Sequence, residues 1–158
     1  MASEQFARRL RGGEPVVGAW SMTGNPVVAE VLAAEGFEFV VLDGEHSENT
    51  IRDLADLVRA VDGTGTGTAP VVRVSGLDRA EIRRVLDFGP EGIVIPQIES
   101  AEEAREAVMA TQYPPEGVRG VAGGRASGYG YDIEDYVSIA NQEIATILQV
   151  ETRGAIDE

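Results

Sequence analysis

The only histidine of the chain stands in the segment Phe39–His46, FVVLDGEH, where an apolar run ends at two carboxylates. Four consecutive apolar residues are typical of a strand that is buried on both faces, as in a parallel sheet. Polar groups that follow such a strand lie at its carboxyl end, where barrels and open α/β sheets carry their active sites. Asp43, Glu45 and His46 are therefore the first candidates for catalytic chemistry.

Further polar side chains lie at the ends of the later apolar runs, namely Arg73, Gln97, Gln149 and Glu151. If these runs are parallel neighbouring strands, their side chains meet at one edge of the sheet. An arginine can stabilise a developing enolate, a histidine can transfer protons, and carboxylates bind hard divalent cations. Each residue alone also has an ordinary structural explanation as an ion pair or scaffold group, so it is their convergence that predicts a site.

The elements that would position these side chains alternate between helix and strand. Helix starts are marked by Asn25 before Pro26 and by the capping box of Ser100 with Glu103. The pattern predicts strands over residues 16–20, 39–42, 71–74, 92–95 and 144–150. It predicts helices over residues 3–10, 26–35, 50–61, 78–87, 100–111 and 133–140, with an irregular glycine-rich stretch over 116–131. Such alternation indicates parallel βα units with right-handed crossovers.

The number of these units decides the fold class. A complete eight-unit barrel takes about 250 residues, and this chain of 158 residues reaches its fifth strand. We therefore predict an α/β fold in which residues 1–158 form a single, partial TIM (β/α)8 barrel domain, with the first five strands present and the C-terminal units absent. A self-contained flavodoxin-like sheet is the structural alternative.

The amino-acid composition limits which reactions and which binding partners are compatible with the chain. A net charge of −14 argues against nucleic acid or an anionic membrane as a partner. All 13 basic residues are arginine, so no lysine is present to form an imine with a substrate carbonyl. Cysteine is absent, which excludes disulfides and thiolate chemistry. No apolar run reaches the roughly 20 residues of a membrane span, and a signal peptide is not apparent, so we expect a cytoplasmic location.

Several segments, taken in order along the chain, carry a resemblance to a known family. They are Val17–Trp20, LDGEHS at Leu42–Ser47, PVVRV at Pro70–Val74, YPPEGVRG at Tyr113–Gly120, RASGYG at Arg125–Gly130 and QVETRGA at Gln149–Ala155. Together these segments resemble the HpcH/HpaI aldolase family, the metal-dependent pyruvate aldolases of the 4-hydroxy-2-oxoheptanedioate and 2-dehydro-3-deoxyglucarate aldolase type. The resemblance implies a TIM barrel that reversibly cleaves a 4-hydroxy-2-oxo acid to pyruvate and an aldehyde through a metal-bound pyruvate enolate.

The resemblance also implies roles for individual residues in catalysis. His46 would be the proton acceptor that activates a metal-bound water, with Asp43 close by. Asp87 would raise the basicity of His46, an assignment that rests on the resemblance alone. Arg73 would contact the substrate and stabilise the enolate. A second substrate contact would come from Gln149.

The metal and the assembly are implied in the same way. Glu151 would be a ligand of a divalent cation, Mg, Mn or Co. The second carboxylate ligand of the family lies in a later segment resembling GPADLS, which this chain does not contain, so water and substrate would have to fill most positions. The partners would be the 2-oxo acid and aldehyde, and the full-length form would be a homo-oligomer such as a hexamer.

Three points stay open on the sequence alone. The chemistry could be that of a citrate-lyase-like carbon–carbon lyase of the same superfamily. The chain could instead be an inactive, truncated half-barrel or an assembly partner. Arg119 and Arg125 would face the site or a neighbouring subunit, or would belong to a solvated loop.

Overall fold

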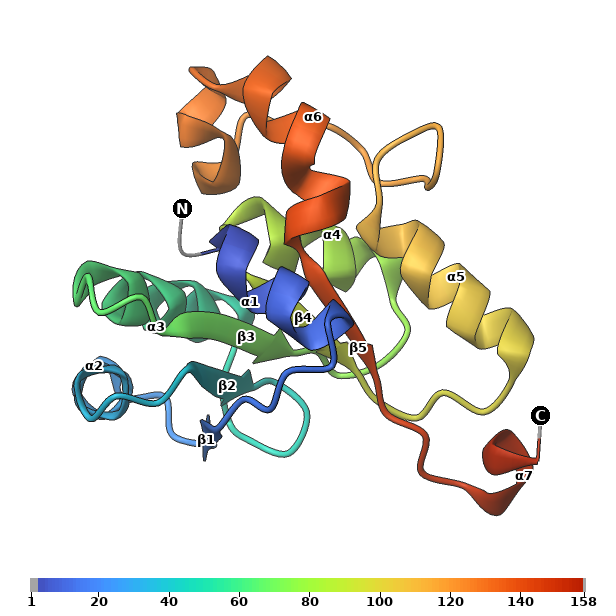
Figure 1. Cartoon of the computed structure of the whole chain (residues 1–158), viewed down its shortest axis with the longest axis horizontal. Coiled ribbons are helices and arrows are strands. Elements are labelled where there is room, and N and C mark those ends of the chain that lie inside the picture. Colours follow the sequence, from blue (N-terminus) through green and yellow to red (C-terminus); the bar gives the residue numbers. More distant parts are fainter. Residues whose placement is uncertain (1–2, 158) are drawn as a thin grey trace.

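The computed structural model describes residues 3–157. Within this range the chain forms one parallel sheet of five strands, which stand side by side in the order of the sequence (Figure 1). The strands are β1 (Gly18–Ser21), β2 (Phe39–Asp43), β3 (Ala69–Arg73), β4 (Gly92–Ile95) and β5 (Ala145–Leu148). Consecutive order is that of a βα barrel, whereas a flavodoxin-like sheet reverses its order at a switch point. The partial barrel is therefore confirmed, and the flavodoxin-like alternative is wrong.

Helices alternate with these strands as the sequence predicts, and polar caps fix where several of them begin. Asn25 Oδ1 accepts a hydrogen bond of 3.0 Å from the Val27 N–H, and Thr50 with Asp53 forms a capping box. Caps of this kind stabilise a helix by about 1 kcal/mol each. The helices are α1 (Ser3–Arg11), α2 (Pro26–Ala34), α3 (Ile51–Gly63), α4 (Arg79–Asp87), α5 (Ala101–Thr111), the 3-10 helix η1 (Arg125–Gly130), α6 (Ile133–Glu143) and α7 (Arg153–Ile156).

The limits of β4 match the predicted strand, and those of the other strands differ from the predicted ones by up to two residues. β3 begins at Ala69 because Ala69 and Pro70 pair with Phe39 and Val40 of β2. The predicted strands 16–20 and 144–150 are shorter in the structure, where β1 covers Gly18–Ser21 and β5 covers Ala145–Leu148. Pairing with the neighbouring strands sets these limits, and the residue-by-residue pairing is not visible in the pattern of one strand alone.

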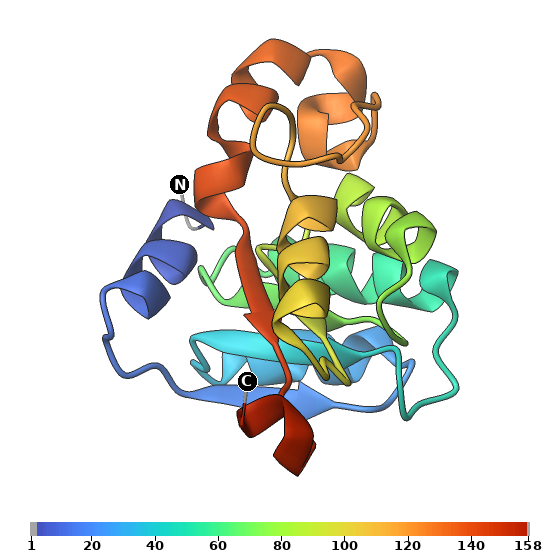
Figure 2. The ribbon, with the colours of Figure 1, turned by 90° about the vertical axis from the view of Figure 1, so that its right-hand side faces the viewer.

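The sheet has apolar side chains on both faces, and each face packs against a different set of helices. Figure 2 shows α1 on one side of the strands and α3, α4 and α5 on the other. On the side of α1, Phe6 and Ala7 pack against Val41, Val71 and Val94, which line the face that a barrel turns inward. The alternate residues of the same strands pack against α2 to α5 and form the larger core. Burial on both faces explains the unbroken apolar runs of β2 and β4.

The two edges of the sheet are β1 and β5 among residues 3–157. Each edge strand therefore has one neighbour, whereas a strand in a closed barrel has two. Over the same residues, no helix combines the length and apolar character that crossing a membrane requires.

Glu91, just before β4, is a half-buried acidic side chain. Its Oε2 atom is buried without a hydrogen-bond partner, and the residue lines a hollow of about 380 Å³ together with Arg125, Tyr136 and Glu143. Burial, reinforced by the negative charges of Asp62 and Glu143, raises the pKa of Glu91 to about 7. The native state therefore binds a proton at Glu91 more tightly than the unfolded chain does.

The Glu91→Gln substitution is expected to raise the free energy of unfolding at pH 8 by about 2 kcal/mol. In the unsubstituted protein, the favourable contribution of protonated Glu91 is complete below pH 4.5 and is lost as the pH rises through about 7. Glutamine stays neutral, so the gain should vanish toward pH 4.5. Urea unfolding at several pH values measures this difference. The exposed Glu35→Gln variant is the control, and a gain independent of pH would contradict the explanation.

Candidate active site

The centre of the candidate site is an ion pair between the last residues of β2 and β3. Asp43 and Arg73 are direct partners in the register of these two strands. Arg73 donates from Nε to Asp43 Oδ1 and from Nη2 to Asp43 Oδ2, both at 2.7 Å. The Asp43 side chain is fully buried and that of Arg73 is 9% exposed. This two-pronged geometry fixes the guanidinium plane at the carboxyl edge of the sheet.

The charge state of this pair follows from its surroundings. Burial acts to raise the pKa of Asp43, but hydrogen bonds from Arg73 and from the backbone N–H groups of Glu45 and His46 outweigh it and lower that pKa below its usual value. The hydrogen bond to Asp43 raises the pKa of Arg73 further. The pair is therefore an ionised carboxylate with a guanidinium, and Arg73 is a permanent cation at the strand ends.

The loop after β2 places Glu45 and His46 against this pair. Glu45 Oε2 lies 2.7 Å from Arg73 Nη1, and its side chain is 6% exposed. His46 Nε2 lies 3.5 Å from Glu45 Oε1, while 69% of the His46 side chain remains exposed. The loop is held in place because the Ser47 hydroxyl and the Asn49 amide both donate to the Asp43 carbonyl. His46 therefore faces solvent from a fixed loop.

Two residues for which the sequence predicted no role also shape this edge. The Trp20 ring covers Arg73, whose Cζ lies 4.7 Å from the ring centroid. Gly44 donates its N–H to the Arg73 carbonyl at 2.8 Å, and a Cβ at this position would stand 2.7 Å from that same oxygen. The aromatic ring next to a strand and the glycine inside DGEH are signals in the sequence, but their meaning depends on the strand order.

Residues after β4 and β5 extend the site. The Gln97 backbone N–H donates to Glu151 Oε2 at 2.9 Å, and Gln97 Nε2 donates to Glu45 Oε1 at 3.0 Å. Gln149 places its Oε1 atom in a buried position without a hydrogen-bond partner. The structure thus brings together side chains from four strand ends, as the sequence predicts. We call Asp43, Glu45, His46, Arg73, Gln97, Gln149 and Glu151 the strand-end network.

Asp87 is not part of this network. It is the last residue of α4, which returns to the edge where β4 begins, and its Oδ1 atom lies 3.5 Å from Arg119 Nη2. A helix in a βα unit runs opposite to its strands, so its last residue lies at the edge remote from the strand carboxyl ends. Between residues 3 and 157 no contact joins Asp87 to His46, so the role of Asp87 in raising the basicity of His46 stays a prediction.

Arg119 and Arg125 also lie outside the strand-end network. The Arg119 side chain is fully buried, and its Cζ lies 4.5 Å from the ring centroid of Tyr113 and 5.7 Å from that of Tyr136. Arg125 donates to Asp62 Oδ2 at 2.7 Å and to the Phe88 carbonyl at 3.0 Å. Both arginines stabilise the packing of the irregular stretch, so neither faces the strand-end network, while contact with a neighbouring subunit stays a prediction.

The oxygen atoms on the β5 side of the network are of the kind that a hard divalent cation binds. They are too few to fill its coordination sphere. The buried Oε1 of Gln149 lacks a donor, and Gln97 occupies one carboxylate oxygen of Glu151. Magnesium and manganese prefer such carboxylate and carbonyl ligands. Yet no three His, Cys, Asp or Glu side chains between residues 3 and 157 are grouped to hold a metal. The network therefore offers part of a coordination sphere.

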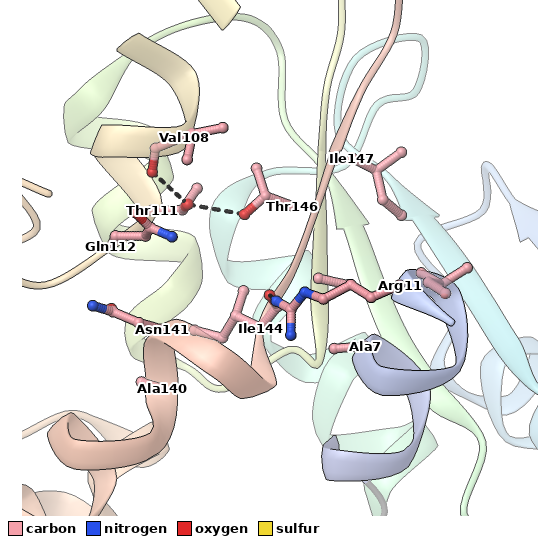
Figure 3. Close-up of a pocket in the computed structure, with 12 residues that line it drawn as sticks. Ala7, Arg11, Val108, Thr111, Gln112, Ala140, Asn141, Ile144, Thr146 and Ile147 are labelled. Carbon is pink, nitrogen blue, oxygen red and sulfur yellow. Dashed lines mark hydrogen bonds between the residues drawn. The ribbon is translucent and has the colours of Figure 1, made fainter. Parts of the chain in front are cut away.

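A hollow of about 460 Å³ lies away from the strand ends, between α1, α5, α6 and β5 (Figure 3). Thr111 donates to the Val108 carbonyl at 2.8 Å and shares a hydrogen bond of 2.9 Å with Thr146, while Arg11 reaches the Ile144 carbonyl at 3.1 Å. None of the strand-end network lines this hollow. It lies along the open edge of β5, and we assign it no part in the chemistry of the site.

Comparisons with known proteins agree on one family. The hydroxypyruvate/pyruvate aldolase of Paraburkholderia phytofirmans is 42% identical over 155 residues, which cover 95% of this chain and 59% of that protein. The 2-keto-3-deoxy-L-rhamnonate aldolase of Klebsiella pneumoniae is 38% identical over 159 residues, covering 99% of this chain and 58% of that protein. The chain thus spans 58–59% of the length of these curated relatives.

A solved structure gives the same result for the fold. An HpcH/HpaI aldolase/citrate lyase family protein from Burkholderia cenocepacia J2315 superposes with a TM-score of 0.93 at 38% identity, covering 98% of this chain and 62% of that one. The sequence model described as HpcH/HpaI aldolase/citrate lyase matches residues 17–158, a range that includes the whole strand-end network. The chain therefore belongs to the HpcH/HpaI aldolase/citrate lyase family.

Proposed function

We propose that the strand-end network belongs to a metal-dependent, class II pyruvate aldolase that cleaves a 4-hydroxy-2-oxo acid to pyruvate and an aldehyde. The observation that carries this proposal is the buried Asp43–Arg73 pair, which holds a permanent cation beside His46 at the carboxyl edge of the sheet. The names of the relatives, a hydroxypyruvate/pyruvate aldolase and a 2-keto-3-deoxy-L-rhamnonate aldolase, support an oxo acid as the substrate.

In the proposed reaction His46 accepts the proton of the substrate 4-hydroxyl group, directly or through one water. The C3–C4 bond then breaks, C4 becomes the aldehyde carbon, and the electron pair of the bond moves to C3 to form the enolate of pyruvate. A proton delivered to C3 completes pyruvate. The exposed imidazole of His46 suits this role because it can reach substrate and solvent while its loop stays fixed.

Arg73 stabilises the negative charge that develops on the oxo-acid end. The guanidinium is already oriented by Asp43, so it needs no reorganisation when the enolate forms. Its position is also held from the sides by Glu45 and by the Trp20 ring. A fixed cation of this kind stabilises charge more than a mobile surface arginine would.

A divalent cation, Mg, Mn or Co, would be held by Glu151 with Gln149 beside it. When bound, the cation supplies a Lewis acid that draws electron density from the substrate oxo group. The net negative charge of the network supports a bound cation. Asp43, Glu45 and Glu151 contribute three carboxylates, and Arg73 is the single cation among them. The remaining ligands would come from water, substrate and groups outside this network.

We further infer the setting in which this chemistry takes place. Residues 1–158 act as one partial-barrel domain, and the partners are the small 2-oxo acid and its aldehyde. The protein works in the cytoplasm as a homo-oligomer such as a hexamer. Its net charge of −14 supports the inference that nucleic acid and anionic membranes are not partners.

Replacement of Glu151 by glutamine is expected to weaken binding of Mn²⁺ with oxalate, a mimic of the pyruvate enolate, by more than about tenfold, because it removes the carboxylate ligand. Calorimetric titration of the 158-residue chain measures this affinity, and Glu35→Gln controls for the loss of one negative charge. Equal affinity in the two variants would contradict the role of Glu151. Activity is tested separately as pyruvate release from 4-hydroxy-2-oxo acids, which should stop on removal of the metal and return on its addition.

Experiments on the same chain also distinguish two other candidate functions from the proposed one. The family description includes citrate lyases, so a citrate-lyase-like carbon–carbon lyase is the second candidate, and a substrate profile that favours such substrates over 4-hydroxy-2-oxo acids would select it. An inactive half-barrel or assembly partner has no reason to bind the cation. A clear rise in melting temperature with Mn²⁺ and oxalate would argue against that last function.

A further inference from the structure

Gln97, just after β4, adopts a backbone conformation that residues with a side chain rarely take. Its φ is +56°, and between residues 3 and 157 only Tyr129 shares a positive φ among non-glycine residues. The flanking residues are fixed to Gln149, just after β5, since the Gln149 N–H donates to the Ile95 carbonyl and the Ile98 N–H donates to the Gln149 carbonyl, both at 3.0 Å. The backbone therefore takes its left-handed conformation at Gln97 between Ile95 and Ile98, which are both held by hydrogen bonds.

This conformation directs two donors of one residue at two carboxylates. The Gln97 N–H lies 2.9 Å from Glu151 Oε2, and Gln97 Nε2 lies 3.0 Å from Glu45 Oε1. A carboxylate oxygen accepts but does not donate, which fixes the end of the Gln97 amide that faces Glu45. The same Glu45 oxygen lies 3.5 Å from His46 Nε2. Gln97 thus connects the proposed cation ligand with the carboxylate beside the proposed proton acceptor.

We propose that Gln97 is a positioning residue with two separable tasks. Its backbone N–H holds one oxygen of Glu151 and so presents the other oxygen to the divalent cation. Its side-chain amide holds Glu45 in the position from which that carboxylate contacts Arg73 and His46. The proposal rests on the proposed function for the roles of Glu151 and His46. Groups that orient a metal ligand typically change metal affinity 10- to 100-fold when they are lost.

Two substitutions test the backbone task. Gln97→Gly keeps the N–H and suits a positive φ, so the Mn²⁺–oxalate affinity should stay within about twofold of the unsubstituted chain, with an equal or higher melting temperature. Gln97→Val disfavours a positive φ, so the N–H should turn away from Glu151 and the affinity should fall about tenfold. Equal affinities of the glycine and valine variants would overturn the backbone task.

The Gln97→Met substitution tests the side-chain task. Methionine has a similar length and is equally constrained at positive φ, but it cannot donate a hydrogen bond to Glu45. Because the chain has one histidine, its imidazole Hε1 resonance reports on His46 without ambiguity. This resonance should move at constant pH in Gln97→Met and stay in place in the matched surface variant Gln142→Met. An unmoved resonance in Gln97→Met would overturn the side-chain task.

A measurement without metal separates this proposal from the proposed function. The backbone amide of Gln97 should exchange with solvent slowly in the metal-free chain, because it donates to Glu151, and at least about tenfold faster in Glu151→Ala. Slow exchange together with no Mn²⁺–oxalate binding would refute the metal site while the positioning contact stands. An exchange rate that Glu151→Ala leaves unchanged would refute the contact itself, whatever the activity.

Discussion

Substitution of Arg73 by methionine is expected to lower the free energy of unfolding at pH 7 by about 3–5 kcal/mol, as for other buried ion pairs that lose one partner. The reason is Asp43, whose fully buried carboxylate receives two hydrogen bonds of 2.7 Å from Arg73. Without the guanidinium this carboxylate is a buried charge with only backbone donors. Urea unfolding followed by circular dichroism measures the loss.

The pH dependence of this loss gives a second check. In the unsubstituted chain the pKa of Asp43 is lowered, so its contribution to stability is present above the usual carboxyl range and is lost as the pH falls. In Arg73→Met that contribution is already gone, so the difference between the two proteins should shrink toward acid pH.

The double variant Arg73→Met/Asp43→Asn identifies the cause of the instability. It removes the unpaired charge, so it should recover at least half of the lost stability. A double variant as unstable as the single one would instead place the loss in the packing of Arg73 against Trp20, where the guanidinium carbon lies 4.7 Å from the ring centroid. Arg73→Lys keeps the charge without the planar fork and should be intermediate.

The convergence of the site could be predicted from the sequence because parallel strands end at a common edge. Apolar runs before Asp43, Gln97 and Gln149 locate those ends, and the strand order then follows from the short βα units. The two-pronged contact could not be predicted, since it depends on Asp43 and Arg73 being exact register partners of β2 and β3. A shift of one residue would have turned Arg73 to the other face of the sheet.

The sequence did not determine the backbone conformation of Gln97 or the position of Asp87 in the fold. Nothing in the letters PQIE indicates a positive φ at Gln97, because that conformation depends on the hydrogen bonds that hold Ile95 and Ile98 to Gln149. Asp87 could be given a role only by resemblance, and the direction of α4 carries it to the opposite edge of the sheet. Roles that depend on the path of the chain between elements are therefore the hardest to infer from local patterns.

The substitution His46→Asn is expected to reduce the rate of aldol cleavage by about 10²- to 10⁴-fold, the usual effect of removing a general base. Stability should change by less than about 0.5 kcal/mol, because 69% of the His46 side chain is exposed and its one ion-pair contact, to Glu45, is 3.5 Å long. Pyruvate release with excess Mn²⁺ measures the rate. The neighbouring exposed variant Glu48→Gln, which leaves Glu45 and His46 in place, is the control.

The exposure of His46 also allows a test that separates proton transfer from positioning. If His46 accepts the substrate proton, imidazole added to His46→Gly can enter the vacated space from solvent and restore part of the rate. Binding of Mn²⁺ with oxalate should be unaffected in both His46 variants, because Glu151 and Gln149 follow β5, whereas His46 follows β2. A loss of binding together with an absence of rescue would mean that His46 maintains the loop around Asp43 instead of moving the proton, and the base would then have to be sought outside residues 43–46.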